Sequence, residues 1–139
     1  MPTLDLERIF RKQMASYAAC DVDGLLLSFT DDCVLRDMAD PAHPFTGKDE
    51  IRGFLTGYFA DLRNVAVTIS NVAVGETVVI GELDVTADYV SAPYSVAEPH
   101  PIRLRYCIAE EIRDGLVANE RFYWDSAALN GQLRQATDA

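Results

Sequence analysis

Asp37 is the residue of this sequence whose type and position best suit it to acid-base chemistry. It ends the apolar run that begins at Cys33, and the rigid, proline-containing loop 40–47 follows it. A carboxylate at the end of a buried strand, among aromatic side chains, can act as a general base or acid. The other interpretation is a structural carboxylate that caps loop 40–47. The sequence leaves both interpretations open.

Arg103 is the second residue that we expect to take part in catalysis. If it faces a cavity beside Asp37, its guanidinium can stabilise an enolate or a carboxylate. The alternative is a buried salt bridge from Arg103 to Asp37 or Glu120, which would hold the interior together. An inward Arg103 also turns Arg105 inward, because side chains two positions apart on a strand share a face.

The rest of the expected cavity wall is apolar and aromatic, with tyrosine hydroxyls that can donate hydrogen bonds to a ligand oxygen. Asp125 follows this wall, and we interpret it first as the N-cap of a terminal helix and second as a catalytic group. The candidate pocket residues are Gln13, Tyr17, Phe54, Tyr58, Tyr89, Arg105, Glu120, Phe122 and Trp124.

Other titratable residues are not assigned to the cavity. Glu110 and Glu111 are interpreted as solvated positions near a turn. His43 and His100 lie in proline-rich loops without a cysteine or a second histidine at ligand spacing, and the three cysteines are far apart. The sequence has no glycine-rich phosphate loop or dinucleotide fingerprint. We therefore predict neither a metal nor a cofactor.

Hydrophobic periodicity predicts which elements position these residues. Apolar residues recur at helical spacing in the first half, and long β-rich segments separated by turn residues make up the second half. In chain order, we expect a first helix that ends at 20, a second helix 22–29, a strand 33–37, a third helix after 46, strands 65–74, 78–90, 102–112 and 116–124, and a short helix after 125.

This order predicts an α+β fold, in which three N-terminal helices pack on a curved, mostly antiparallel sheet and enclose a conical pocket. The arrangement is α-α-β-α-β-β-β-β, followed by the short C-terminal helix. We expect residues 1–139 to form a single domain, because this length suffices for one core but is too short for two.

Composition restricts the kinds of partner. The chain has 12 basic and 22 acidic side chains, and its net charge of −10 repels phosphate backbones and anionic lipid. We therefore expect neither nucleic acid nor a membrane as a partner. The sequence has no run of 18 apolar residues, and its first residues do not resemble an export signal, so we expect a cytoplasmic protein.

Two stretches resemble the nuclear transport factor 2-like superfamily, which includes ketosteroid isomerases, limonene epoxide hydrolases and SnoaL-like polyketide cyclases. Residues 19–32, followed by Asp37 and residues 46–51, resemble the first half of ketosteroid isomerases. The ending, residues 123–133, resembles SnoaL-like proteins. By this resemblance Asp37 matches the proton-shuttling base of the isomerases, while Gln13 and Arg103 stand where those enzymes have their two oxyanion donors.

We therefore expect a small-molecule enzyme that performs cofactor-independent acid-base chemistry, as an isomerase, dehydratase or cyclase, on an apolar oxygenated substrate. The alternative is a non-catalytic ligand-binding or dimeric accessory protein of the same fold. We also expect a homodimer through the outer face of the sheet. The apolar residues predicted to form that face are Ile102, Leu104, Tyr106 and Ile108.

Overall fold

The computed structural model describes residues 5–137, with side chains up to Arg134. In this range the helices are α1 (Leu6–Ala18), α2 (Val22–Leu27), α3 (Gly47–Ala60) and α4 (Ser126–Thr137). The strands are β1 (Phe29–Asp37), β2 (Phe45–Thr46), β3 (Leu62–Val74), β4 (Val78–Tyr89), β5 (His100–Arg113) and β6 (Leu116–Tyr123).

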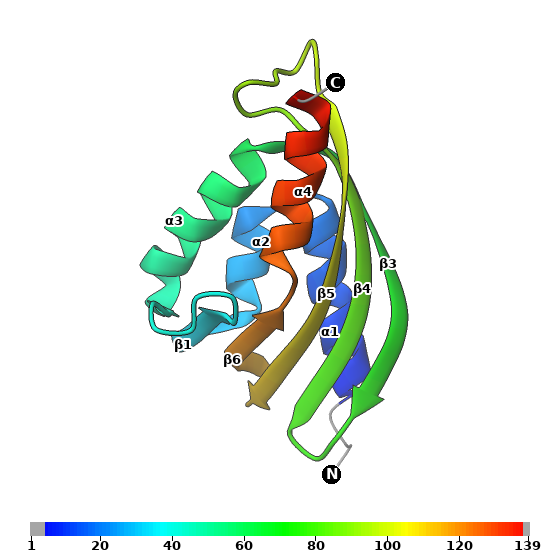
Figure 1. Cartoon of the computed structure of the whole chain (residues 1–139). Coiled ribbons are helices and arrows are strands. Elements are labelled where there is room, and N and C mark those ends of the chain that lie inside the picture. Colours follow the sequence, from blue (N-terminus) through cyan, green and yellow to red (C-terminus); the bar gives the residue numbers. More distant parts are fainter. Residues whose placement is uncertain (1–4, 138–139) are drawn as a thin grey trace.

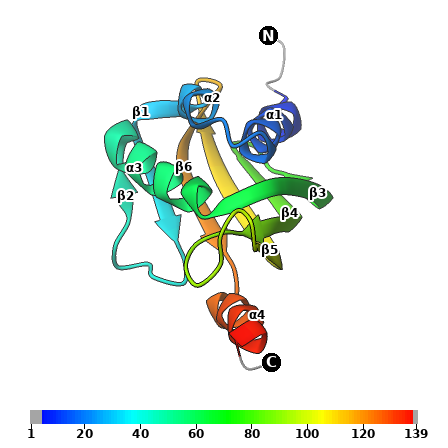
Figure 2. The same ribbon diagram turned by 90° about the horizontal axis from the view of Figure 1, so that it is seen from above.

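The strands form one curved sheet in the order β2-β1-β6-β5-β4-β3. β1 runs parallel to β6, and the other neighbouring strands are antiparallel. The long strands β3, β4 and β5 bend around one side of the molecule, and α3 stands on the other (Figure 1). Seen from above, α1 lies against β3 and β4, and α4 lies at the far end beside β5 (Figure 2). The predicted α+β class is confirmed.

The first helix places a polar side chain in the core. α1 begins after Asp5, whose carboxylate accepts a hydrogen bond from the Arg8 backbone nitrogen at 3.0 Å. This bond satisfies one of the free amides at the start of the helix. The buried residues of α1 are Leu6, Phe10, Gln13 and Met14, which share one face because of their helical spacing. Gln13 therefore enters the interior from α1.

The second helix is shorter than predicted, and the first strand is longer. α2 ends at Leu27, and β1 includes residues 30–32, which we expected to lie between a helix and a strand. A distant partner fixes the start of the strand: the Val117 amide donates to the Ser28 carbonyl at 2.8 Å, and β1 pairs with β6 at Phe29 and, after a register shift, again at residues 34–37. The strands of the second half begin and end within three residues of their predicted bounds.

A glycine on β4 makes room for the most buried aromatic ring of α1. Phe10 is fully buried, and a Cβ atom on Gly81 would lie 2.2 Å from its ring. Gly57, on the exposed side of α3, has no heavy atom within 4 Å of the corresponding position. The two glycines therefore offer the same substitution in opposite environments.

We predict that Gly81→Ala lowers the free energy of unfolding by about 1–3 kcal/mol, because the added methyl group overpacks the Phe10 site. Gly57→Ala is expected to raise it by about 0.5–1 kcal/mol, since alanine has the higher helix propensity. Urea denaturation of both variants measures the difference. A Gly81→Ala protein as stable as the wild type would show that Phe10 does not rest on β4.

Within residues 5–137, none of the helices combines the length and the hydropathy that a membrane span requires.

Candidate functional site

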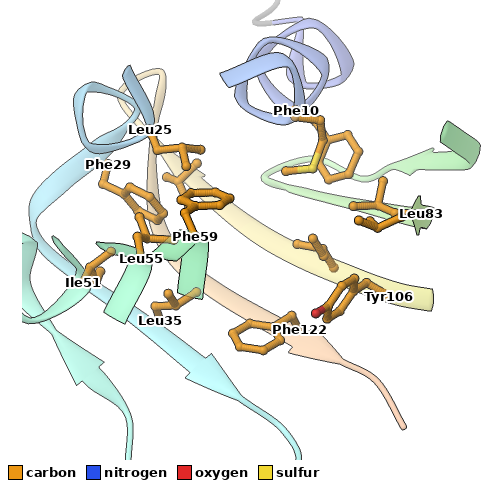
Figure 3. Close-up of a cluster of buried hydrophobic side chains, with 14 of the residues drawn as sticks. Phe10, Leu25, Phe29, Leu35, Ile51, Leu55, Phe59, Leu83, Tyr106 and Phe122 are labelled. Atoms are coloured by element: carbon orange, nitrogen blue, oxygen red, sulfur yellow. The ribbon is translucent and has the colours of Figure 1, made fainter. Parts of the chain in front are cut away.

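The helices and the sheet enclose a narrow cavity whose wall is mainly aromatic and aliphatic. About 50 Å³ of it is open to the centres of water molecules. Tyr106 and Phe122 project from β5 and β6 toward the side chains of β1 and α3 (Figure 3). The lining residues are Gln13, Met14, Tyr17, Leu25, Phe29, Leu35, Phe54, Leu55, Tyr58, Tyr106, Ile108, Glu120 and Phe122.

Stacked rings hold one side of this cavity in shape. The Phe54 ring lies 4.6 Å from that of Phe45 and 5.9 Å from that of Phe122, measured between centroids. Phe122 in turn meets Tyr106 edge to face at 6.0 Å. Such contacts between aromatic rings add to the stabilisation from buried area alone, so they stabilise this side of the wall.

Three tyrosine hydroxyls form a network on the cavity wall. The hydroxyls of Tyr17 and Tyr58 are hydrogen-bonded, and that of Tyr58 lies 3.1 Å from that of Tyr106. Burial raises the pKa of each phenol, so all of them keep their protons at neutral pH. Two hydrogen bonds among these hydroxyls use two of their three O–H donors. One O–H donor therefore remains for a ligand.

A pair of buried acids, one of which lines the cavity, joins β5 and β6. Glu110 on β5 is directly opposite Glu120 on β6, and the two side chains are 0% and 8% exposed. Gln13, which is 2% exposed, reaches this pair from α1. Glu120 and Gln13 line the cavity, whereas Glu110 is not among its lining residues. The prediction that Glu110 is solvated is wrong.

Burial raises the pKa of both acids. Desolvation, followed by the charge of Glu120 and a hydrogen bond to it, raises the pKa of Glu110 well above its usual range. Desolvation also raises the pKa of Glu120, but hydrogen bonds from Glu110 and Gln13 act in the opposite direction. Of the two acids, Glu110 is therefore the one that holds a proton more strongly.

The alternation of β5 is opposite to the one we predicted. Arg103 and Arg105 are exposed, and the Arg103 Nε atom donates to Asp84 Oδ1 on the outer face of β4 at 2.8 Å. This contact lowers the pKa of Asp84. The expectation that Arg103 and Arg105 face the cavity is wrong, because burial of the apolar side chains decides which face of the strand turns inward.

The same correction affects the predicted outer face. Ile102, Leu104, Tyr106 and Ile108 are all buried, so they belong to the core and do not form an apolar outer surface. Tyr106 is therefore a cavity residue that the sequence reasoning missed. The sequence contains a pattern that predicts this. If the apolar residues of 102–108 are taken as the inward face, strand alternation places Tyr106 and Glu110 on that same face.

Asp37 ends β1 as predicted, but its contacts are with backbone and indole groups. Its Oδ1 atom accepts hydrogen bonds from Trp124 Nε1 at 2.8 Å and from the Ala39 backbone nitrogen at 2.9 Å. Asp37 is half-buried and is not among the residues that line the cavity. These contacts fit the structural interpretation. The Trp124 ring lies 5.8 Å from that of Tyr106, which connects Asp37 to the cavity wall.

The remaining candidates divide into two groups. Tyr89 lies away from the cavity and packs edge to face against Tyr94 at 5.9 Å. Asp125 caps α4, since its carboxylate accepts from the backbone nitrogens of Ala127 and Ala128 at 3.0 and 3.2 Å. The predicted residues that do lie on the cavity wall are Gln13, Tyr17, Phe54, Tyr58, Glu120 and Phe122.

In the part of the chain that the structure describes, no three His, Cys, Asp or Glu side chains come close enough together to hold a metal ion.

Comparisons with known proteins identify the fold. A family model described as a SnoaL-like domain matches residues 10–120. A search of curated proteins finds no significant match to the sequence. Among solved structures, a proposed SnoaL-like polyketide cyclase from Shewanella putrefaciens CN-32 superposes with a TM-score of 0.82 at 14% identity, over 97% of this chain and 98% of that one.

Two further structures show how widely this fold is used. A hypothetical protein with a ketosteroid isomerase-like fold from Catenulispora acidiphila DSM 44928, in complex with trimethylamine, has a TM-score of 0.76 at 20% identity, over 89% of this chain and 90% of that one. An LEH-like epoxide hydrolase from M. tuberculosis has a TM-score of 0.71 at 18% identity, over 91% and 88%. The predicted resemblance is confirmed at the level of the fold.

Proposed function

Because this chain belongs to the SnoaL-like domain family, we propose that it is a small-molecule enzyme that performs cofactor-independent acid-base chemistry, by isomerisation, dehydration or cyclisation. The observation that carries the proposal is the composition of the cavity wall. A buried acid, Glu120, and a network of tyrosine hydroxyls share one aromatic cavity. Perturbed titratable groups in an apolar pocket are typical of catalytic sites.

In this proposal Glu120 moves the proton. Its pKa is raised by burial, which brings its protonation equilibrium closer to neutral pH, where a general base or acid is most effective. Glu120 takes the role that the sequence assigned to Asp37. Asp37 remains the rival base, because it ends the strand next to β6 and its partner Trp124 contacts Tyr106.

The tyrosine network holds the substrate oxygen. A hydroxyl that stays protonated in an apolar site can donate to an oxygen on which negative charge develops, and such a bond is strong because water is excluded. This replaces the role that the sequence assigned to Arg103, which lies on the outer face of the sheet. The network contains one free O–H donor, so we expect a single substrate oxygen to be bound there.

The ligand is proposed to be small and largely apolar. Aromatic and aliphatic side chains make up most of the wall, and the open space is small for a ligand pocket. A ligand larger than a few heavy atoms therefore requires side chains of the wall to move.

A non-catalytic binding protein is the second candidate. The specific observation in its favour is that Asp37, the base expected from the resemblance, already binds Trp124 and the Ala39 amide. A cavity without a free base would bind its ligand and release it unchanged. The two candidates predict the same binding but differ in turnover.

We predict that small cyclic ketones, lactones, epoxides or polyketide-like aromatics stabilise the protein against heat, because a bound ligand favours the folded state. Trp124, the one tryptophan of the sequence, reports binding through its fluorescence, since its ring neighbours the cavity residue Tyr106. Product formation is then measured for each ligand that binds. Turnover supports the enzyme, and binding without turnover supports the second candidate.

Tyr58→Phe tests whether the cavity is the site, because Tyr58 is the central member of the network. The variant is expected to lower turnover by about 10²-fold, the usual effect of losing one donor to a developing negative charge. Tyr94→Phe is the matched control, since the Tyr94 hydroxyl donates to the Leu133 carbonyl outside the cavity. Equal activity of the two variants would show that the active site lies outside this cavity.

A further inference from the structure

Glu110 is a buried acid that the proposed reaction does not use. It is 0% exposed and is not among the residues that line the cavity. Its position follows from the strand register, because Glu110 and Glu120 are direct partners in the antiparallel pair of β5 and β6. Side chains of such partners point to the same face of the sheet and lie close together.

The surroundings do not favour two ionised carboxylates. Neither oxygen of Glu110 nor Oε1 of Glu120 receives a hydrogen bond from the N–H and O–H donors of the described residues. None of the ion pairs within residues 5–134 includes either acid. Two adjacent like charges without a cation are costly in an apolar interior. At least one of the two carboxyls must therefore be protonated.

The contacts decide which acid holds this proton. Gln13 from α1 lies beside both carboxyls, and the other titratable side chains that line the cavity are those of the network tyrosines. The negative charge of Glu120 helps to raise the pKa of Tyr17. Glu110 has no contact with the cavity, whereas Glu120 has one, so the ionised form is less strongly disfavoured at Glu120.

We propose that Glu110 is a positioning residue: its protonated carboxyl donates a hydrogen bond to Glu120, which keeps Glu120 ionised and directed at the substrate. This inference rests on the proposed function of the cavity. Paired carboxyls that share one proton are a known way to give two identical groups different roles. Here the buried member holds the proton and the cavity member accepts one.

One proton moves between the substrate and Glu120 in the proposed reaction. A C–H or O–H bond of the substrate breaks, its proton moves to Glu120, and the electron pair stays on the substrate as an enolate or alkoxide. The negative charge passes from the acid pair to the substrate oxygen, where the tyrosine network donates a hydrogen bond. Glu120 then returns the proton to another substrate atom or to a departing hydroxyl group. The proton of Glu110 stays in place throughout.

Gln13 completes the arrangement. Its Oε1 atom is buried and receives no hydrogen bond from the described residues, although its amide is in contact with both acids. When Glu120 takes up a proton, the pair has two O–H donors, and Gln13 Oε1 can accept one of them. Gln13 Oε1 can therefore accept a hydrogen bond from the carboxyl that takes up the second proton.

The test compares Glu110→Gln with Glu110→Met. A glutamine amide still donates a hydrogen bond to Glu120, whereas methionine has a similar size and donates none. We expect the pKa of Glu120 to rise by about one to two units in Glu110→Met relative to Glu110→Gln, which corresponds to one hydrogen bond to a charged group. Carbon-13 NMR titration of labelled glutamate carboxyls measures this in the protein without substrate.

A second measurement covers the case in which Glu110→Met does not fold. The folded-state pKa of Glu110 is raised above its ordinary value of 4.5, so its contribution to the free energy of unfolding is complete below that pH. The contribution is lost as the pH rises through the folded-state pKa. Glu110→Gln has no such proton, and we expect its stability to fall less with rising pH than that of the wild type.

Two results would overturn the inference. One is the same Glu120 titration in both Glu110 variants, and the other is the same pH dependence of stability in Glu110→Gln and the wild type. Neither measurement needs a substrate, so both can fail or succeed independently of the proposed function. If turnover is found, the acid limb of its pH profile should shift upward in Glu110→Met and be restored in Glu110→Gln.

Discussion

Glu120→Gln is expected to lower turnover by about 10²–10⁴-fold while ligand binding persists, the usual loss when a general base or acid is removed. Glutamine has nearly the same shape as glutamate and preserves the cavity wall, but it cannot take up a proton. The change therefore separates proton transfer from binding. Steady-state kinetics should show the loss in kcat, with a smaller change in the dissociation constant measured by Trp124 fluorescence.

Asp37→Asn provides the decisive comparison. An asparagine oxygen can still accept the hydrogen bonds from Trp124 and the Ala39 amide, so the structural role of Asp37 survives the change. We expect this variant to keep most of the activity. If Asp37→Asn abolishes turnover and Glu120→Gln does not, the base is Asp37, as the resemblance implied, and Glu120 is a structural acid.

Glu111→Gln is the control for a change of charge on β5. Glu111 neighbours Glu110 in sequence but is exposed, and its carboxylate lies 3.5 Å from Arg121 Nη1. An exposed ion pair of this kind contributes little to stability, so the variant should behave like the wild type. If Glu111→Gln loses as much turnover as Glu120→Gln, the loss arises from the change in net charge and not from the change in the cavity.

Phe10→Ala is expected to lower the free energy of unfolding by about 3–5 kcal/mol, the range observed when a fully buried aromatic ring is truncated. Phe10 is 0% exposed and fills the space above Gly81 on β4. Removing its ring loses buried area and leaves a cavity where α1 meets the sheet. Leu27→Ala is the control, because Leu27 is 76% exposed and its truncation should change stability by at most about 0.5 kcal/mol.

The contact of Phe10 with Gly81 can be tested further by combining the changes. Gly81→Ala destabilises because its methyl group meets the Phe10 ring, so the penalty should disappear in a Phe10→Ala background. A double-mutant cycle measured by urea denaturation gives this coupling. Additive effects of the two substitutions would show that the penalty at Gly81 arises from the backbone and not from the ring.

Local features of the sequence determined the elements. The apolar spacing of α1 and α3 and the β-rich segments of the second half were sufficient to predict the α+β class, because amphipathic periodicity is a property of neighbouring residues. The interpretation of Asp125 as a helix cap has the same origin, since the cap bonds amides two and three residues further along. Such interactions are short in sequence and can be recognised without a partner.

Tertiary structure decided the inward face of β5. An alternating strand presents two possible faces, and we anchored the alternation on Arg103 through a family position. Burial of Ile102 and Leu104 against the helices selected the opposite face, which placed Arg103 next to Asp84 in solvent. A one-residue difference in phase moves every side chain of the strand to the other face, so this single error placed both arginines in the predicted cavity and left Tyr106 out of it.

The composition of the candidate site also depends on distant contacts. Tyr17, Tyr58 and Tyr106 come from α1, α3 and β5, and Trp124 reaches Asp37 from the end of β6. The sequence determined that acids and tyrosines were available, and tertiary structure decided which ones meet. Whether a carboxyl such as Glu110 is a solvated charge or a buried proton donor depends on its neighbours in space, because desolvation and the adjacent acid shift its pKa.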